Sequence, residues 1–277
     1  MAAAIIQLSP GMQVERWKVI KKLGEGGFGA VYKVAGQGGE YALKTEGVSE
    51  QIQVLKLEVL VLTDLGKRGG RHFCKIEDKG RFGAFNYVVM TFVGKSLQDL
   101  RKAGPGGHMS LGTALGAGIQ ALEALEGSTG QLRNRVATAT HRGVIRKPRA
   151  AAGFRGTVRY APISCHLQRE LCRKDDMETW IYMQVEITTG NLPWKNVEDM
   201  NQVGEYKKRC RQQPAINELF AGCPQQYHQL LSLCDKCKYY DAPPYQQAYQ
   251  LCRQAMQSNN VQEFPYDWEK PAGGGMF

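Results

Sequence analysis

The sequence has no long apolar run. Its most apolar stretch, Val54–Leu62, is interrupted by Lys56 and Glu58 and falls far short of the roughly 20 residues that a bilayer-spanning helix needs. The first eight residues are apolar but carry no basic flank, which argues against a secretory signal peptide. We therefore expect no membrane association, eight reduced cysteines, and a location in the cytoplasm or in both cytoplasm and nucleus.

Acidic residues are scarce in the middle of the chain. Residues 127–174 contain 11 lysines and arginines but a single acid, Glu170, and no aspartate occurs between Asp99 and Asp175. The charges before and after this segment cancel, so the segment accounts for the formal net charge of +10. A basic segment of this kind favours phosphate groups, acidic peptides or nucleic acids as partners. The missing aspartates exclude any chemistry that needs one there.

The remaining composition is that of an ordinary folded protein. The chain has 277 residues, of which 43% are hydrophobic and 22% are charged, enough for one large domain or a two-lobed one. In the first hundred residues, β-branched or aromatic runs between glycine-rich turns predict an antiparallel sheet, with a turn at Lys79-Gly80 and one helix laid on it. The expected strands are 17–23, 30–34, 40–45, 73–76 and 85–90, and the expected helix is 51–65.

From Ser96 onward the apolar residues repeat at spacings of three and four, which predicts helices. The clearest stripe runs from Leu111 to Leu125. Further helices are expected at 175–189, 197–211, 225–237 and 244–256. The predicted fold class is therefore α+β, with a sheet-bearing lobe followed by a mainly helical one.

A G-x-G-x-x-G-x-V motif spans Gly24–Val31. Alone it is a weak signal, because two unrelated nucleotide-binding folds use it. In a dinucleotide-binding fold the third glycine opens a helix, whereas here a strand follows and leads to Ala42-Leu43-Lys44. This order favours a glycine-rich hairpin over ATP phosphates, with Lys44 reaching the α and β phosphates. An ordinary turn is the alternative.

Lys44 needs a carboxylate to orient it, and the candidate on the expected helix is Glu58. An ordinary surface acid is the other interpretation. Glu58 lies in an otherwise apolar segment, where an unpaired charge would be costly. We therefore favour a Lys44–Glu58 pair.

Together these motifs resemble a eukaryotic protein kinase of the casein kinase I superfamily, nearest to the tau tubulin kinase branch. The resemblance covers nearly the whole chain except about residues 128–147. It is carried first by Gly24–Val34, Ala42-Leu43-Lys44, Gln53–Glu58 and Phe85–Met90, and then by Pro148-Arg149, Gly153–Ala161, Asp175-Asp176, Leu192-Pro193-Trp194 and Tyr266–Lys270.

The resemblance implies an N-terminal extension (1–16), a kinase N-lobe (17–93), a C-lobe (94–269) and a flexible tail (270–277). It implies that Met90 is the gatekeeper and that Asp176 is a buried helix aspartate holding the active-site backbone. The implied ATP-binding residues are Leu23, Gly24, Glu25, Gly26, Gly27, Phe28, Gly29, Val31, Ala42, Lys44, Met90, Thr91 and Val93. The implied substrate or anion groove contains Arg149, Arg155, Thr157 and Arg159.

The family's catalytic centre has no counterpart in this sequence. Phosphoryl transfer requires an aspartate as proton acceptor, and an asparagine and a second aspartate as Mg²⁺ ligands. The family supplies them as HRD…N and DFG between the helix ending near Glu126 and Pro148. Here the nearest triplet is His141-Arg142-Gly143, and roughly 25 to 30 residues of the family pattern are absent. No catalytic residue is identified, and we expect weakened ATP binding without Mg²⁺ ligands.

Two functions are therefore expected as alternatives. The chain is an inactive, monomeric pseudokinase or shortened isoform whose basic groove binds acidic or phosphorylated proteins. Alternatively, it derives from an active serine/threonine kinase whose full product contains the absent segment. Zinc at Cys234 and Cys237 is disfavoured, because a lone CxxC is weak evidence. Nucleic-acid binding is disfavoured, because the basic segment has few stacking aromatics.

Overall fold

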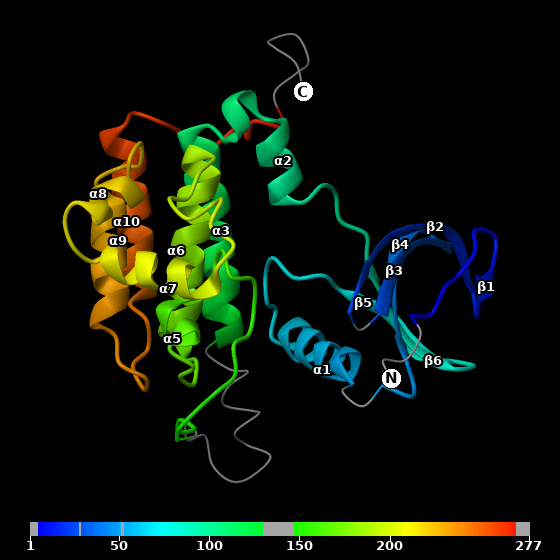
Figure 1. Cartoon of the computed structure of the whole chain (residues 1–277). Coiled ribbons are helices and arrows are strands. Elements are labelled where there is room, and N and C mark those ends of the chain that lie inside the picture. Colours follow the sequence, from blue (N-terminus) through cyan, green and yellow to red (C-terminus); the bar gives the residue numbers. More distant parts are fainter. Residues whose placement is uncertain (1–4, 28, 51–52, 130–146, 270–277) are drawn as a thin grey trace. The chain divides into compact units, whose positions relative to one another are not determined.

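The computed structural model describes residues 5–27, 29–50, 53–129 and 147–269 (Figure 1). The chain divides into two compact units, Met1–Gly94 and Lys95–Phe277. The boundary that the sequence suggests between the lobes, after residue 93, lies one residue from this division. Each unit has its own hydrophobic core.

The first unit contains a six-stranded antiparallel sheet with the strand order β1-β2-β3-β4-β6-β5. Side chains alternate along β3, where Ala30, Tyr32 and Val34 are fully buried and their neighbours are not, as a strand with one face on a core requires. The strands are β1 (Gln13–Val14), β2 (Trp17–Gly26), β3 (Gly29–Gly36), β4 (Gly39–Gly47), β5 (Ile76–Phe82) and β6 (Phe85–Thr91).

Residues 5–14, which the sequence analysis assigns to an extension, pack on this sheet. β1 pairs with β2, and Leu8 and Val14 are buried in the core of the unit. The backbone N–H of Leu8 donates to the Tyr32 hydroxyl at 3.1 Å, and this hydroxyl donates to the Ile6 carbonyl at 2.8 Å. The phenol of a core tyrosine therefore ties the segment to β3.

The helix α1 (Val54–Lys67) packs against β4, β5 and β6. The expected helix is confirmed from residue 54 onward, and residues 51–52 lie outside the described residues. Its end differs slightly, because the helix continues one residue past Gly66. The backbone N–H groups of Arg68 and Gly69 then donate to the carbonyls of Leu65 and Gly66.

The expected strand at 73–76 and the expected turn at Lys79-Gly80 are wrong. β5 runs from Ile76 to Phe82, and the chain turns at Gly83, whose φ is 56°. Gly80 lies inside the strand, paired with Tyr87, and a β-carbon there would come within 2.8 Å of the Tyr87 hydroxyl oxygen. This glycine makes room for a neighbouring ring rather than for a turn.

The second unit is helical, as predicted. Its central helix is α6 (Arg173–Thr189), which is buried around most of its circumference and packs against α3 and α9, the pattern of a helix inside a core. The other α-helices among the described residues are α2 (Leu97–Ala103), α3 (Leu111–Thr129), α5 (Ile163–His166), α7 (Met200–Arg209), α8 (Ala215–Leu219), α9 (Gln226–Lys236) and α10 (Tyr245–Ser258) (Figure 1). None of the described helices is long and apolar enough to cross a membrane.

Candidate functional site

The glycine motif forms the hairpin between β2 and β3. Gly26 and Gly29 pair at its tip, and the strand register aligns Gly24 with Val31 and Val31 with Lys44 across three neighbouring strands. A β-carbon on Gly29 would lie 1.8 Å from the Thr45 carbonyl oxygen. The motif therefore allows close approach of β3 to β4 at the tip. Phe28 lies outside the described residues.

A cavity of about 330 Å³ lies beside this hairpin, inside the first unit. Backbone atoms of the glycine motif, the side chain of Lys44 and the first turn of α1 surround it. The lining residues are Gly24, Glu25, Gly26, Gly27, Gly29, Val31, Lys44, Thr45, Glu46, Val54 and Leu55. Its size lies within the range of small-molecule sites, and its lining combines the glycine motif and the cationic Lys44 with two acids, Glu25 and Glu46.

The expected pair is present, because Lys44 of β4 and Glu58 of α1 form an ion pair. Both side chains keep about a third of their surface exposed. A pair this open to water contributes little stability. Its consequence is geometric: Glu58 fixes the direction of the Lys44 ammonium group at the cavity.

A buried carboxylate holds α1 at this place. Glu46 follows Lys44 by two residues on β4 and is 2% exposed, and its Oε1 accepts a hydrogen bond from the backbone N–H of Leu55 at 2.9 Å. Leu55 is in the first turn of α1, so a negative charge meets the positive end of the helix. The other carboxylate oxygen of Glu46, Oε2, is buried without a hydrogen-bond partner. Glu46 thereby sets the start of the helix that carries Glu58.

The residues implied for an adenine ring also lie in the first unit. Ala42 and Met90 are paired across β4 and β6. The backbone N–H of Thr91 donates to the Lys75 carbonyl at 3.0 Å, which leaves that donor occupied. Leu23 and Val93 are 42% and 62% exposed. Apolar side chains this exposed provide area that a planar base could cover.

The four groove residues are not equivalent. Arg149 makes a two-pronged ion pair with Glu170, with Nη2 3.1 Å from Oε1, and this hydrogen bonding lowers the pKa of Glu170. Thr157 and Arg155 are exposed, and Arg155 has no ion pair within the described ranges. Of these three residues, Arg155 is the cation that stays available to an anion.

Arg159 is engaged inside the second unit. Its Nη1 lies 2.9 Å from Oε1 of Glu186, a carboxylate that is 1% exposed. The Tyr160 hydroxyl donates to the same carboxylate, and burial together with this contact raises the pKa of Tyr160 to about 12. The indole N–H of Trp194 donates to the Arg159 carbonyl at 2.8 Å. The contacts of Arg159 therefore hold the groove segment in place, and the carboxylate of Glu186 balances the charge of Arg159.

Lys207, which no pattern in the sequence indicated, anchors the groove segment. It is fully buried on α7, and its ammonium group donates to the carbonyls of Val158 and Ala161, each at 2.7 Å. Burial lowers its pKa to about 7. The polar sequence around it, Glu205 to Arg209, is typical of an exposed helix and gave no sign of a buried lysine.

The start of α6 also differs from expectation. The buried aspartate is Asp175, which is 1% exposed and accepts from the Cys172 N–H at 2.6 Å as a helix cap. Asp176, expected to be buried, is only half-buried, so that prediction is wrong. Within the part of the chain that the structure describes, no group of three or more His, Cys, Asp or Glu side chains could hold a metal ion.

The fold and the glycine hairpin with its Lys44–Glu58 pair define a protein kinase-like molecule. No protein-family model matches the chain. The chain is 31% identical to a serine/threonine-protein kinase candidate of Dictyostelium discoideum, over 94% of this chain and 58% of that protein. It is 32% identical to the serine/threonine-protein kinase spe-6 of Caenorhabditis elegans, over 92% of this chain and 76% of spe-6. The chain thus spans little more than half of the first of these relatives.

Two further similarities concern the branch of kinases and the fold. A casein kinase I candidate of Caenorhabditis elegans is 25% identical over 95% of this chain and 86% of that protein. The solved structure of vaccinia related kinase 3 covers 95% of both chains with a TM-score of 0.74 at 15% identity, which supports the fold. The chain belongs to the serine/threonine protein kinases of the casein kinase I superfamily.

The alignments also contain positions that this chain does not fill. The alignment to the Dictyostelium kinase extends over 291 positions, whereas 94% of the 277 residues here is about 260 residues. About 30 aligned positions therefore have no residue in this chain.

Proposed function

We propose that this chain is a tau tubulin kinase-like pseudokinase that binds ATP through its N-lobe and does not transfer phosphate. One contrast carries the proposal. The Lys44–Glu58 pair and the glycine hairpin are in place, while no aspartate occurs between Asp99 and Asp175. A kinase needs both parts, because its catalysis combines phosphate positioning with an aspartate-held metal and an aspartate base.

The residues present fit the nucleotide better than they fit its metal. Lys44 and the backbone of the glycine hairpin line one cavity and would face the phosphates, while Ala42, Leu23 and Val93 would cover the base. Mg²⁺ prefers carboxylate oxygens, and residues 127–174 offer Glu170 alone, which Arg149 occupies. When bound, Mg²⁺ would neutralise the triphosphate.

Nucleotide binding by purified protein tests the proposal. We expect ATP to bind with an affinity that changes little between excess Mg²⁺ and EDTA, because the chain supplies no family metal ligands. Lys44→Met should weaken binding by about tenfold to a hundredfold, since a charge-assisted hydrogen bond to phosphate contributes about 1.5–3 kcal/mol. The matched control is Lys21→Met, which removes an exposed charge outside the cavity. Equal affinity of wild type and Lys44→Met would reject the assigned site.

The second candidate function is an active serine/threonine kinase whose full product is longer. The roughly 30 unfilled alignment positions favour it. Intact mass and peptide mapping from Leu125 to Arg149 on the native protein distinguish the two. A mass of 30.8 kDa with both junction peptides supports the pseudokinase. A mass about 3 kDa larger, at the mean residue mass of this chain, supports the active kinase.

We also propose that the groove of the second unit binds acidic or phosphorylated proteins through Arg155. It is exposed and lacks an ion pair among the described residues, unlike Arg149 and Arg159. Arg155→Glu should weaken binding of a phosphopeptide, and the loss of affinity should be greater at low salt than at high salt, because salt screens surface charges. Arg169→Glu, also exposed, is the matched control. Unchanged phosphopeptide affinity in Arg155→Glu would reject this groove.

A further inference from the structure

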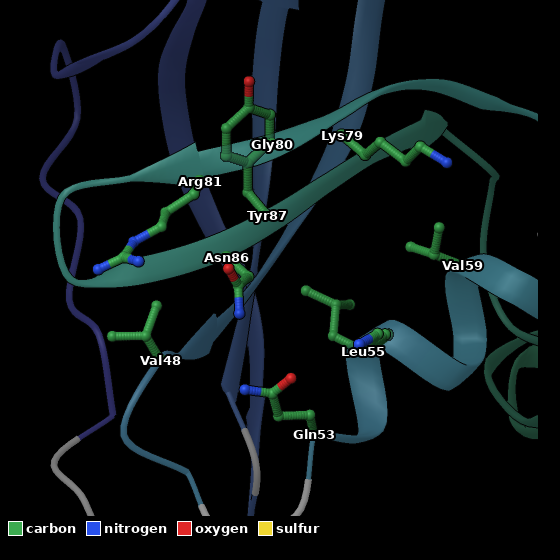
Figure 2. A pocket seen from close by; sticks show the side chains of 10 residues that line it. Val48, Gln53, Leu55, Val59, Lys79, Gly80, Arg81, Asn86 and Tyr87 are labelled. Atoms are coloured by element: carbon green, nitrogen blue, oxygen red, sulfur yellow. The ribbon is translucent and has the colours of Figure 1, made fainter.

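A cavity in each unit lies away from the glycine hairpin. The one between α1 and the hairpin of β5 and β6 has a volume of about 460 Å³, and Figure 2 shows its mixed lining, in which Gln53, Leu55 and Asn86 lie between Arg81 and Lys79. Such a mixture of cations and amides does not select one kind of ligand. The cavity of the second unit differs, because its lining carries almost no charge.

This cavity lies between α9 and α10, which pack side by side (Figure 1), and has a volume of about 510 Å³. We call it the α9–α10 cavity. Gln226 at the start of α9 donates through Nε2 to the hydroxyl of Ser258 at the end of α10, at 2.9 Å. The two helices are therefore antiparallel, and Lys236, the last residue of α9, lies toward the start of α10.

Carboxamide side chains dominate the lining of the α9–α10 cavity. Gln247, Gln250 and Gln254 follow one another along one face of α10, and Gln229 contributes from α9. All four are exposed, and none of them has a hydrogen-bond partner within the described residues, unlike Gln226. The cavity therefore presents several groups that can each donate and accept a hydrogen bond.

One end of the α9–α10 cavity is positively charged. Lys236 is the one charged side chain among the described residues of the lining, and it forms no ion pair in the described ranges, whereas its neighbour Asp235 pairs with Arg211. The start of α10 adds to this charge, because its N-cap residue Pro244 offers no side-chain acceptor and its first turn contains no acid. Burial lowers the pKa of His228, so this further lining residue stays uncharged at neutral pH.

These features describe a ligand with an uncharged, hydrogen-bonding backbone and one negative charge at its end. A carboxamide matches a peptide group, because each offers an N–H donor and a C=O acceptor. Gln247 and Gln254 are seven residues apart, about 10.5 Å along the helix axis, and three residues of an extended chain span about 10 Å. The C-terminus of a protein has this combination, because its single α-carboxylate ends a neutral backbone.

We propose that the α9–α10 cavity binds the extended C-terminal segment of a partner protein. The terminal carboxylate would lie at Lys236 and the start of α10, and the peptide groups of the last three residues would hydrogen-bond to Gln247, Gln250 and Gln254. Leu233 lines the cavity, is half-buried and precedes Lys236 by three residues, on the same face of α9. Its contact with the terminal side chain would favour an apolar last residue.

A polyanion is the weaker match for this cavity. A nucleic acid strand or a multiply phosphorylated segment needs several cations, whereas Lys236 is the one cation that the described lining offers. No Phe, Tyr or Trp among the described residues lines the cavity, so bases would have no ring on which to stack. The α9–α10 cavity is thereby distinct in its chemistry from the groove around Arg155.

Fluorescence anisotropy of the full chain with a labelled peptide, Gly-Ser-Gln-Ala-Leu with a free C-terminal carboxylate, tests the proposal. The same peptide with a C-terminal amide should bind about fivefold more weakly, because the charge that meets Lys236 is absent. Lys236→Ala should weaken binding of the free-carboxylate peptide to a similar extent. The matched control is Lys238→Ala, which removes an exposed charge outside the cavity and should leave the affinity unchanged.

A second pair of variants tests the carboxamides. Gln250→Ala should weaken binding of the peptide about twofold to tenfold, because hydrogen bonds to its backbone are lost. Gln246→Ala is the matched control, since this residue is exposed on the same helix but does not line the cavity. Alanine is the best helix former, so α10 should stay folded in both variants.

Four results would overturn the proposal: no binding up to about 1 mM peptide, equal affinity of the carboxylate and amide peptides, equal loss in Lys236→Ala and Lys238→Ala, or equal affinity of Gln250→Ala and Gln246→Ala. An amidated peptide ending in glutamate that binds as tightly as the free-carboxylate peptide would instead assign the site to an acidic side chain. A dimer in sedimentation that Gln250→Ala dissociates would assign it to a second copy of this chain.

The test is independent of the functions proposed above. ATP affinity should not change in these variants, because the nucleotide cavity lies in the first unit. Arg155→Glu should leave the affinity for the free-carboxylate peptide unchanged, because Arg155 does not line the α9–α10 cavity. A loss of peptide binding in Arg155→Glu would place the peptide in the groove and contradict the proposal.

Discussion

The backbone N–H of Leu55 donates to Oε1 of Glu46 at 2.9 Å, so a side chain of the sheet caps the helix that carries Glu58. Glu46 is two residues after Lys44 on β4. One short stretch of strand therefore provides both the lysine of the nucleotide site and the group that positions its carboxylate partner.

Glu46→Ala should loosen the attachment of α1 to β4, and with it the position of Glu58 relative to Lys44. The Leu55 N–H would lose its acceptor in a buried position, which costs about 1–3 kcal/mol of unfolding free energy. ATP affinity should fall as well, because Glu58 would no longer be fixed beside Lys44. Glu46→Gln keeps an acceptor oxygen and should retain most of the affinity. Chemical denaturation and ATP titration of both variants check this, and equal behaviour of the two would show that Glu46 does not cap α1.

Gly29→Ala should disrupt the glycine hairpin. A β-carbon at this position would lie 1.8 Å from the Thr45 carbonyl oxygen, a backbone atom that cannot rotate away. We expect a loss of about 1–3 kcal/mol in stability from this overpacking, together with weaker ATP binding. Gly24→Ala, where nothing lies within 4 Å of the added carbon, is the control and should keep wild-type stability. A Gly29→Ala protein as stable as Gly24→Ala would contradict the register at the hairpin tip.

Glu186 balances buried positive charge in the second unit. Its carboxylate lies 2.9 Å from Arg159 and 3.7 Å from Arg101, whose side chain is 6% exposed. Glu186→Ala would leave Arg101 buried without compensation, and we expect a loss of about 3–5 kcal/mol. Arg159→Ala removes the more exposed partner and should cost less. Thermal unfolding of the two variants checks this order, and the reverse order would refute it.

Lys207 should make stability depend on pH. Burial lowers its pKa from the ordinary 10.5 to about 7, whereas an unfolded chain restores the ordinary value. Between these values the unfolded state holds a proton that the folded state lacks, so unfolding free energy rises with pH by up to about 1.4 kcal/mol per unit. The penalty of burying the lysine is complete below pH 7 and fades above it. The pKa of the adjacent His166 is lowered, which keeps that ring neutral in this window.

Comparison with Lys207→Met isolates this effect. The Tm of the wild type relative to Lys207→Met should increase from pH 7 to pH 9, because methionine cannot titrate. A difference between the two proteins that stays constant over this range would show that Lys207 keeps its proton when folded.

The sequence predicted the fold class where patterns were regular. The alternation that ends at Val34 and the stripe from Leu111 to Leu125 each repeat at one period, and both elements are present. Gly80 was misread because a glycine that admits the Tyr87 ring looks, in sequence, like a glycine that turns the chain. Local pattern does not distinguish these two reasons for a missing side chain.

The site was predictable in part for the same reason. The Lys44–Glu58 pair could be found because motif spacing and an apolar helix both indicated it. The engagement of Arg159 by Glu186 and the burial of Lys207 could not, because each depends on contacts between segments far apart in the chain. Charge composition alone cannot separate a balanced arginine from an available one such as Arg155.

The most direct test of the central claim is phosphate transfer by the 277-residue chain itself. Purified protein that binds ATP should be incubated with radiolabelled ATP, Mg²⁺ and casein or tubulin, beside Lys44→Met. We predict no incorporation above the level of Lys44→Met in either substrate, because no aspartate is available between Asp99 and Asp175 to accept the proton or hold the metal. Robust incorporation that is lost in Lys44→Met would contradict the account and make the chain an active kinase.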